Sequence, residues 1–523
     1  MFQVEATDLA GRKGRLKTKH GSIDTPVILP VIHPVRQEIP CSKIRSLGFP
    51  AVMTNAYVTY KKYGAEAERR GIHDIIGFDG VVMTDSGGYQ VLEYGKVDVT
   101  PIQIAKFQEA IGSDIAITLD RPTGLKATEQ YAERTIQETY LAAKESMRTI
   151  TRDGVLWSGP VQGGIHYSLV ERSSRLMSRL NFDMYALGSP TEILESYEFL
   201  LLVEMIMAAK KNLPLEAPLH LFGAGHPLTM SLAVALGCDI FDSASYILYA
   251  KGDRYMTEYG TAKLRNLQFF ACSCETCLSY TPEEVRSLKK QDRTEVLALH
   301  NLQILSKEVR SVHEAMEEGR LWEYTGIKAR SHPAMWRAFR AMGNYADFLE
   351  DGTPTFKERG IFLHDPPDDR RPEVVRSANS IIQNIEFPRK KSILVVFAEK
   401  EVTPFYNTSV YRHLSTRLTH LISKAQVSFL LAPFGLIPVE ISDVYPFSQY
   451  VSSLELSGEV EEATITRALE LINSWGPRLT VFFDDDGPYS RIIRKLASKI
   501  HASEVVQASE PEAVTEALTK LLR

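Results

Sequence analysis

Three cysteines and one histidine are the residues of this chain whose types and spacing most clearly suggest chemistry. Cys272, Cys274 and Cys277 are spaced as C-x-C-x-x-C, and His300 follows in a segment with helical periodicity. A short loop can turn three thiolates toward one point while a helix supplies an imidazole, which completes the tetrahedral shell that zinc accepts. Four protein ligands leave no open position for a catalytic water, so the pattern predicts one structural Zn²⁺ per chain. A chance grouping is the alternative, although three of only five cysteines fall within this short segment.

Two aspartates follow apolar runs that read as strands. Asp85 stands in TDSGGYQ, directly before two glycines, and Asp242 stands in a similar place in FDSASY. Two carboxylates about 5 Å apart can carry out a retaining displacement at an anomeric carbon, with one as the nucleophile and the other managing protons. Glycines let the backbone approach a ligand and offer N–H donors, so we expect Ser86 and Gly87 to contact the substrate. The alternative for Asp85 is capping of the following helix.

Asp120 and Gln162 suggest a different task. A carboxylate accepts hydrogen bonds from the ring imino and amino groups of a guanine-type edge, and an amide donates to its carbonyl. Together the two residues could read a purine. The alternatives are that Asp120 is a hydrogen-bonded structural aspartate at the barrel rim and that Gln162 faces solvent. The residues alone leave both alternatives open.

These residues require a scaffold that places strand ends together. Eight short apolar runs, each followed by a polar or glycine-rich tip and a helical stretch, occupy residues 27–33, 51–57, 80–88, 114–120, 156–164, 184–189, 219–225 and 239–246. Continuous apolar strands that alternate with helices indicate a parallel sheet covered on both faces, and eight units are the number that closes a (β/α)8 TIM barrel. An open doubly wound sheet is the second possibility.

Polar residues at the ends of these runs favour the barrel, in which all strand ends converge on one mouth. They are Asn55, Asp85, Asp120, Gln162, Gly188 and Asp242. We therefore predict an α/β barrel with a zinc-binding insertion and a site at its mouth.

The chain is long enough for more than one domain. We expect the barrel over residues 1–345, with the zinc module at 272–300. Residues 346–389 are rich in turn formers and charge and are expected to be an irregular linker. Apolar runs within residues 390–400, 427–435 and 478–487 predict a smaller α/β domain over 390–523.

Composition excludes some classes of protein. The chain carries a net charge of -5 and 44% hydrophobic residues, as in ordinary globular proteins, and its N-terminal stretch lacks an apolar signal segment. We expect a cytoplasmic protein that does not enter membranes, with Cys41 and Cys238 as buried free thiols. A nucleic-acid partner would need local basic clusters, and the candidates are Lys251 with Arg254, Lys263 with Arg265, and Arg389-Lys390-Lys391.

Several motifs resemble the tRNA-guanine transglycosylases, and in detail their archaeal, archaeosine-type branch. They are TDSGGYQ, TLDRPTG, VQGG, YALGS, FDSASY with YAKGDRYM, and the cysteine–histidine quartet, within residues 1 to about 345. The resemblance implies exchange of guanine at position fifteen of the tRNA D arm for 7-cyano-7-deazaguanine, through a covalent glycosyl-aspartate. It assigns Asp242 as the nucleophile and Asp85 as the general acid/base.

The same resemblance implies that Asp120, Gln162 and Gly188 bind the base and that the quartet binds zinc. Residues 371–374 and 432–450 resemble the middle domain shared with archaeosine synthase. The partners implied are tRNA, guanine and a second copy of the chain in a homodimer. Because no segment resembles the usual PUA domain, a separate PUA-domain protein is also expected. The alternatives are an archaeosine synthase-like paralogue and a non-catalytic tRNA-binding subunit.

Overall fold

The computed structural model describes most of the chain. The described residues are 2–88, 98–151, 154–387, 392–398, 405–408, 411–412, 415–416, 425–484, 486–501, 504–508, 516 and 519. The end of the TDSGGYQ motif, Tyr89 and Gln90, and the basic run Arg389–Lys391 lie outside them. The chain divides into two compact units, Met1–Met342 and Gly343–Arg523, and each is described by itself.

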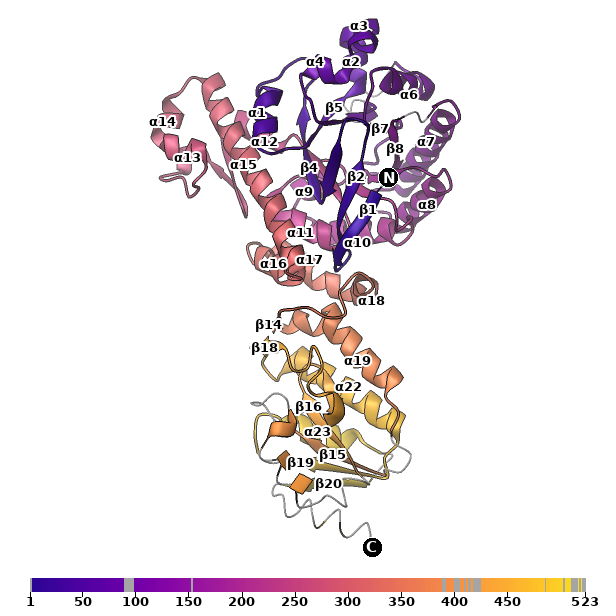
Figure 1. Cartoon of the computed structure of the whole chain (residues 1–523), viewed down its shortest axis with the longest axis vertical. Helices are drawn as coiled ribbons and strands as arrows, with labels where there is room; N and C mark the ends of the chain where they lie inside the picture. The colour runs from indigo at the N-terminus through magenta and orange to yellow at the C-terminus, as the bar shows by residue number, and fades with distance from the viewer. Residues whose placement is uncertain are drawn as a thin grey trace. The chain divides into compact units, whose positions relative to one another are not determined.

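A closed barrel of eight parallel strands forms the first unit and confirms the predicted fold (Figure 1). The strands follow one another around the barrel in chain order, and the last strand, β11, pairs with the first, β4, to close it. They are β4 (Val27–Ile32), β5 (Ala51–Asn55), β6 (Val81–Asp85), β7 (Ile115–Ile117), β8 (Leu156–Val161), β9 (Met184–Leu187), β10 (Leu219–Leu221) and β11 (Ile240–Ser243). Each lies within one of the eight apolar runs, because a strand covered on both faces must be apolar along its length.

Helices cover the outside of the barrel. Their starts follow local sequence signals: Thr100 and Gln103 form a capping box with Pro101 at the first helical position of α6. The apolar run FLLLVEMIMAAK forms the buried helix α10, and no helix among the described residues is long and apolar enough to cross a membrane. The helices are α1 (Cys41–Ser46), α2 (Ala56–Tyr63), α3 (Ala65–Arg70), α4 (Ile72–Ile76), α6 (Pro101–Ala110), α7 (Glu129–Met147), α8 (Tyr167–Ser178), α9 (Thr191–Glu195), α10 (Phe199–Lys210), α11 (Pro227–Ala235) and α12 (Ser245–Lys251).

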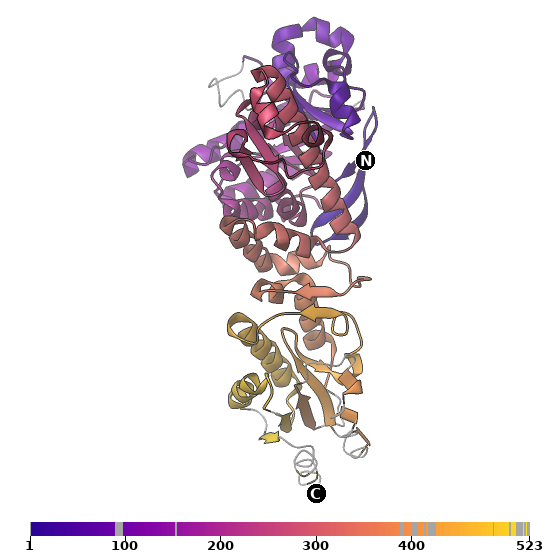
Figure 2. The same ribbon diagram turned by 90° about the vertical axis from the view of Figure 1, so that its left-hand side faces the viewer.

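A three-stranded antiparallel sheet precedes the barrel and was not predicted from the sequence. It contains β1 (Phe2–Asp8), β2 (Gly11–Lys17) and β3 (Ser22–Thr25). Leu16 and Ile23 belong to the same buried cluster as the barrel residues Leu29 and Met53. Figure 2 shows this sheet, in indigo, beside the long helix α15 (Lys290–Glu317), which it contacts.

The turn between β2 and β3 is anchored to the barrel through Asp114, at the amino end of β7. Its Oδ1 accepts hydrogen bonds from the backbone N–H (2.9 Å) and Nδ1 (3.0 Å) of His20, and its Oδ2 accepts from the Val82 N–H (2.9 Å) and from Nε2 of His73 (3.0 Å). Burial raises the pKa of Asp114, but these hydrogen bonds outweigh it and lower the pKa to about 2. The cluster therefore fixes the turn against α4 and the barrel.

An insertion and three further helices follow the last barrel strand. Thr281 and Glu284 form a capping box at the start of α14, with proline at the first helical position. The elements are β12 (Arg254–Thr257), β13 (Gly260–Lys263), η1 (Leu264–Asn266), α13 (Glu275–Ser279), α14 (Pro282–Ser287), α15, α16 (Leu321–Ala329) and α17 (Pro333–Met342).

The second unit is built on a five-stranded sheet with the order β17-β16-β15-β19-β20, in which only β17 is antiparallel to its neighbour. Its strands are β15 (Ile393–Phe397), β16 (Ala425–Leu431), β17 (Gly435–Pro438), β19 (Leu479–Phe483) and β20 (Glu504–Ala508). Its other elements are η2 (Gly343–Tyr345), α18 (Ala346–Glu350), β14 (Ile361–Leu363), η3 (Pro366–Arg370), α19 (Pro372–Asn384), η4 (Phe405–Asn407), η5 (Val439–Ile441), β18 (Tyr450–Ser452), α22 (Gly458–Trp475) and α23 (Ser490–Lys499). The predicted α/β character of this region is confirmed.

The stretch 346–389 differs from the irregular linker expected from the sequence. It contains α18, β14 and α19, β14 pairs with β18, and α19 packs against α22, so the stretch belongs to the second unit. Its charged residues were expected to be exposed in a linker, but several of them are buried in an ion-pair network. Glu373 pairs with Arg371 (2.9 Å) and with Lys357 (2.7 Å), and all three are buried. Pro372, read as a breaker, occupies the first turn of α19, where proline is tolerated.

Candidate active site and metal cluster

A cavity of about 1550 Å³ opens at the carboxyl ends of the barrel strands. Its walls include all six strand-end residues singled out in the sequence, which are Asn55, Asp85, Asp120, Gln162, Gly188 and Asp242. They come from six different strands or the turns directly after them, and barrel closure brings them together. This end of a barrel is where enzymes of this fold place their chemistry.

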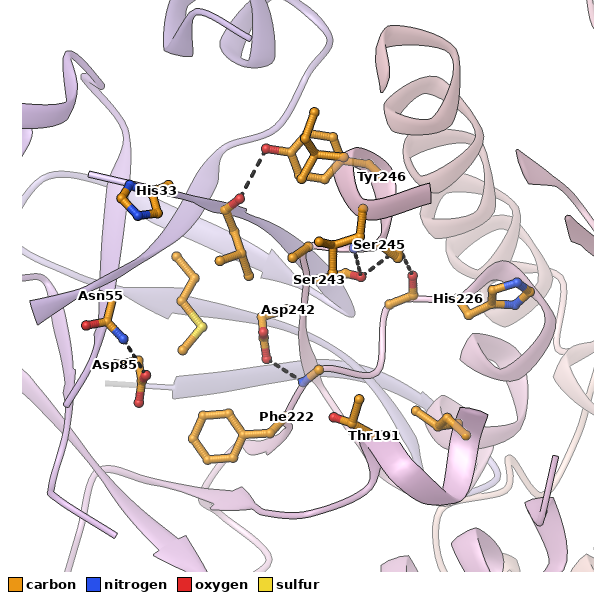
Figure 3. Close-up of a pocket in the computed structure, with 18 of the residues that line it drawn as sticks. His33, Asn55, Asp85, Thr191, Phe222, His226, Asp242, Ser243, Ser245 and Tyr246 are labelled. Carbon is orange, nitrogen blue, oxygen red and sulfur yellow. Dashed lines mark hydrogen bonds between the residues drawn. The ribbon is translucent and has the colours of Figure 1, made fainter. Parts of the chain in front are cut away.

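Asp85 is the last residue of β6, and its carboxylate meets Asn55 at the end of the neighbouring strand. The Asn55 Nδ2 donates to Asp85 Oδ2 at 2.9 Å (Figure 3). Burial, the charge of Asp120 and the charge of Asp242 raise the pKa of Asp85. Backbone hydrogen bonds from Gly87 and Ser86 oppose them, and the resulting pKa is about 7. A carboxyl group with such a pKa can give and take a proton near neutral pH.

Ser86 and Gly87 follow Asp85 directly in the chain, and the contact with substrate expected of them stays a prediction. The Ser86 side chain is buried and donates to the Thr118 carbonyl at 3.3 Å. The backbone N–H groups of both residues interact with Asp85 and lower its pKa, and neither residue lines the cavity. These backbone hydrogen bonds orient the Asp85 carboxylate.

Asp242 lies in β11 and faces the same cavity as Asp85, with the ring of Phe222 beside them (Figure 3). Its Oδ1 lies 2.8 Å from the backbone nitrogen of Gly223, which donates to it, and 2.9 Å from Nε2 of His220. Sequence reasoning missed these three neighbours of the nucleophile candidate. The only available signal was their place at the tip of the run LHLFGAG.

Asp120 and Gln162 contact one another directly. Gln162 Nε2 donates to Asp120 Oδ2 at 2.6 Å, while Gln162 Oε1 accepts from the Thr123 N–H and the Ser189 hydroxyl, both at 3.0 Å. Gln162 is buried, so the solvent-facing alternative is excluded. Burial raises the pKa of Asp120 to about 6, although the hydrogen bond from Gln162 opposes the shift.

Two glycines make room for this pair. A Cβ on Gly88 would lie 1.9 Å from Asp120 Oδ1, and a Cβ on Gly188 would lie 2.2 Å from Gln162 Nε2. The Gly188 N–H donates to the Val161 carbonyl at 2.9 Å, so it serves the barrel ladder. Gly188 therefore contributes space for the Gln162 amide.

Of the predicted basic clusters that fall on described residues, Lys251 with Arg254 lines the cavity. Lys251 forms an ion pair with Glu38, and Arg254 donates to Thr261 Oγ1 at 2.8 Å. Lys263 and Arg265 do not line the cavity.

The predicted quartet also assembles and could hold a metal ion. The donor atoms of Cys272, Cys274, Cys277 and His300 all lie within 4.8 Å of one another. The His300 Nδ1 lies 3.4 Å from Cys274 Sγ and 3.3 Å from Cys277 Sγ, close to the roughly 3.5 Å that a shared tetrahedral zinc would set. Its Nε2 lies 2.8 Å from the Met256 carbonyl, which fixes the proton on Nε2 and leaves Nδ1 for the metal.

Aromatic rings hold the histidine in this orientation. The Tyr255 ring stacks on His300 with centroids 3.8 Å apart and on Phe270 with centroids 5.0 Å apart. The Asn301 side chain accepts from the Met256 N–H at 2.8 Å, which fixes the β12 strand against α15. The cluster thus joins the loop, the hairpin and the long helix.

The fold and the site define a barrel enzyme with two carboxylates facing one cavity at its mouth and a cysteine–histidine cluster that could hold a metal ion. The family model described as queuine tRNA-ribosyltransferase matches residues 8–334. The chain belongs to this family.

Relatives named tRNA-guanine(15) transglycosylase match much of the chain. The protein of Aeropyrum pernix is 48% identical over 362 residues, 69% of this chain and 70% of the relative. That of Sulfolobus acidocaldarius is 36% identical over 510 residues, 95% of this chain and 99% of the relative. That of Pyrobaculum aerophilum is 40% identical over 478 residues, 91% and 94% respectively. The similarity therefore extends through both units.

Proposed function

We propose that this chain is a tRNA-guanine(15) transglycosylase that exchanges guanine in the tRNA D arm for 7-cyano-7-deazaguanine, in archaeosine biosynthesis. The family match and the names of the relatives support the reaction class. The observation that carries the proposal is the opposition of Asp85 and Asp242 in one cavity, with Asp120 close enough to raise the pKa of Asp85.

In the first half-reaction, a carboxylate oxygen of Asp242 attacks C1′ of the target nucleotide. The C1′–N9 bond breaks as the C1′–O bond forms, and its electron pair leaves with guanine. Protonated Asp85 supplies the proton that guanine takes up. The products are neutral guanine, a glycosyl ester on Asp242 and ionised Asp85.

In the second half-reaction, the incoming 7-cyano-7-deazaguanine loses its ring proton to Asp85 as its N9 attacks C1′. The electron pair of the C1′–O bond returns to Asp242 as a carboxylate, and two inversions restore the original configuration. The enzyme ends in its starting protonation state. A pKa of about 7 suits Asp85 to both directions of transfer.

Asp120 and Gln162 would read the purine edge, and Gly188 would keep the space that this requires. The Asp120–Gln162 hydrogen bond keeps both groups in place before the base arrives. Phe222, which lines the cavity beside the two reacting aspartates, offers an apolar ring on which a base can stack (Figure 3). Ser86 and Gly87 would act through Asp85.

We propose that the ion held by Cys272, Cys274, Cys277 and His300 is a single Zn²⁺ with a structural role. Thiolate and imidazole donors are those that zinc prefers, and four of them complete its tetrahedral shell. When bound, the ion would fix the insertion against α15. None of the four residues lines the cavity.

The two alternatives make different demands on the site. An archaeosine synthase-like paralogue would modify the inserted base and would not need both Asp85 and Asp242. A non-catalytic tRNA-binding subunit would need neither the carboxylates nor the buried Asp120–Gln162 pair. A radiolabelled guanine exchange assay on unmodified tRNA separates these functions, because only a transglycosylase incorporates or releases guanine.

The decisive variant is Asp242→Ala. It should lower exchange by more than about a hundredfold, roughly 3 kcal/mol in barrier height, because the nucleophile is lost. The wild type should give a tRNA–protein adduct on denaturing electrophoresis, and the variant should not. Tyr259→Ala, an exposed residue outside the cavity, serves as the control. Retention of more than a hundredth of the wild-type rate by Asp242→Ala would contradict the nucleophile assignment.

We further propose a cytoplasmic homodimer that uses a separate PUA-domain protein to strengthen its grip on tRNA. Support for the dimer comes from Phe269 and Leu278 near the metal cluster, whose side chains are 84% and 76% exposed. Light scattering of the wild type and of Leu278→Glu tests the dimer, and a monomeric wild type would contradict it. Titration of tRNA with and without a PUA-domain protein tests the second partner, and cell fractionation tests the compartment.

A further inference from the structure

A buried histidine touches the nucleophile candidate, and nothing in the proposed reaction uses it. His220 lies in β10 and Asp242 in the neighbouring strand β11, with His220 paired in register to Ile240. The His220 side chain is fully buried, and its Nε2 lies 2.9 Å from Asp242 Oδ1. It packs against Phe222, with ring centroids 4.6 Å apart.

The contacts of Asp242 are unevenly divided between its two oxygens. Oδ1 accepts from the Gly223 N–H at 2.8 Å and lies against His220 Nε2. Within the described part of the chain, Oδ2 makes no hydrogen bond, while Asp242 itself faces the cavity. Only Oδ2 is therefore free to attack a sugar carbon.

The surroundings of the imidazole determine its tautomer. A carboxylate only accepts hydrogen bonds, so the proton must lie on Nε2. The His220 Nδ1 is buried and has no partner among the residues that the structure describes. A proton on Nδ1 would be buried without an acceptor, which is costly. The geometry therefore places the donor on Nε2, aimed at Oδ1.

Gly223 holds the second donor in place. Its φ is +61°, in the left-handed region that glycine favours, and a Cβ there would lie 2.6 Å from Thr191 Oγ1. The backbone N–H can therefore face Asp242 only because this position is glycine. His220 and Gly223 together form a two-donor cradle for a single oxygen.

We propose that His220 is a positioning residue that holds Oδ1 of Asp242 and assigns Oδ2 as the attacking oxygen. This inference rests on the proposed nucleophilic role of Asp242. When Oδ2 forms the ester bond to C1′, Oδ1 becomes the carbonyl oxygen of the ester. When the incoming base displaces the ester, the C1′–O electron pair returns to the carboxylate, and the Nε2–H donates to its restored charge. His220 loses no proton in either step.

This arrangement predicts a kinetic asymmetry. Hydrogen bonds to Oδ1 stabilise the free carboxylate more than the ester, because the carboxylate carries the greater charge. Loss of the donor should therefore slow breakdown of the adduct and increase the fraction of enzyme found as adduct. Loss of comparable preorganised donors in other enzymes lowers kcat by about a hundredfold or more.

The test compares His220→Phe, which keeps an aromatic ring without the donor, with His220→Gln, whose amide nitrogen can replace Nε2. Single-turnover breakdown of the tRNA adduct by added guanine is measured together with kcat, KM and thermal unfolding. We expect His220→Phe to slow breakdown at least tenfold with KM for guanine unchanged, and His220→Gln to stay within about threefold of the wild type. His313→Phe is the control, because His313 likewise donates through Nε2, but to the Pro26 carbonyl and outside the cavity.

Wild-type breakdown by His220→Phe would overturn the proposal. Equal losses in both variants, tracking a common loss of thermal stability, would also overturn it, because His220 would then be merely structural. If His220→Phe fails to fold, His220→Gln decides alone: a loss above a hundredfold in a folded protein refutes the positioning role. Failure of the reaction proposal is distinguishable, since Asp242→Ala would then exchange guanine or form the adduct.

Discussion

Asp85 and Asp242 carry the same functional group in different surroundings, and these surroundings suit them to different roles. Asp242 accepts a hydrogen bond from the Gly223 N–H and lies against a histidine nitrogen, which stabilises a carboxylate. Asp85 is affected mainly by burial and then by the charge of Asp120, which raise its pKa to about 7. These surroundings agree with the proposed roles, which are attack for Asp242 and proton exchange for Asp85.

The raised pKa of Asp85 makes stability depend on pH. Because its folded pKa of about 7 exceeds the ordinary 3.8, the folded state keeps a proton that the unfolded state has lost between these values. Stability contributed by the protonated group is therefore lost as pH rises from about 4 to 7. Asp85→Asn should unfold at a higher temperature than the wild type at pH 8, with little difference at pH 4.

The difference in unfolding free energy should grow by at most about 4 kcal/mol over this range, and by less because the carboxyl is partly accessible from the cavity. Thermal unfolding at both pH values measures it. The exposed Asp79→Asn is the control and should show no such growth. A constant difference between Asp85→Asn and wild type at pH 4 and pH 8 would show that the pKa is not raised.

At the scale of elements, the site depends on the points where strands end. The barrel brings the ends of its strands to one cavity, and the turns after β6 and β9 carry glycines that leave room for side chains from neighbouring strands. The cysteine–histidine cluster also depends on several elements. The segment 272–277 supplies the cysteines, α15 supplies His300, and the β12–β13 hairpin supplies the Met256 carbonyl and the Tyr255 ring that orient it. Position within an element therefore matters as much as residue type.

Gly188→Ala should weaken binding of the base. The added Cβ would lie 2.2 Å from Gln162 Nε2, and the Gln162 amide is held by Asp120, Thr123 and Ser189 and cannot withdraw freely. We expect KM for guanine to rise at least tenfold, a change of about 1.4 kcal/mol. Gly260→Ala, where a Cβ meets nothing within 4 Å, is the matched control. An unchanged KM would exclude Gln162 from base recognition.

Cys274→Ala should remove the metal and loosen the insertion. A structural zinc site contributes on the order of 10 kcal/mol to the folding of a small module, so residues 272–300 should exchange their amide hydrogens faster. Metal analysis should give one zinc per wild-type chain and none for the variant. Cys41→Ala, which removes a buried free thiol outside the cluster, should retain zinc. Absence of zinc from carefully purified wild type would refute the metal assignment.

At the scale of the whole molecule, an acidic chain has to bind an acidic partner. The net charge is -5, so attraction for tRNA must come from local positive charge, and Lys251 and Arg254 supply it at the cavity. The family match makes tRNA the partner to test.

Binding of tRNA should weaken steeply as salt rises. Each phosphate contact adds about 0.9 to the slope of log affinity against log salt for a duplex, so Lys251→Ala and Arg254→Ala should each reduce the slope by about that amount. Lys17→Ala, an exposed residue outside the cavity, should leave the slope unchanged. Salt-insensitive binding by the wild type would contradict the electrostatic account.

The sequence determined the barrel, the metal quartet and the carboxylates at the strand ends, because each signal is local. Buried parallel strands are apolar along their whole length, and C-x-C-x-x-C brings three thiolates together within six residues of one short segment. Their residues can be read without knowing what lies across the fold. Local composition predicted an irregular linker over residues 346–389, because it cannot show that charged side chains of this stretch pair with one another in the folded chain.

Tertiary structure alone decided which neighbours act on these groups. The contact between His220 and Asp242 depends on the register of β10 against β11, and the raised pKa of Asp85 depends first on its burial and then on the nearby charge of Asp120. Likewise, the packing of Leu16 and Ile23 of the β1–β3 sheet against the barrel core is seen only in the folded chain. Register, burial and distance between strands are properties of the closed barrel, so no single segment of the sequence contains them.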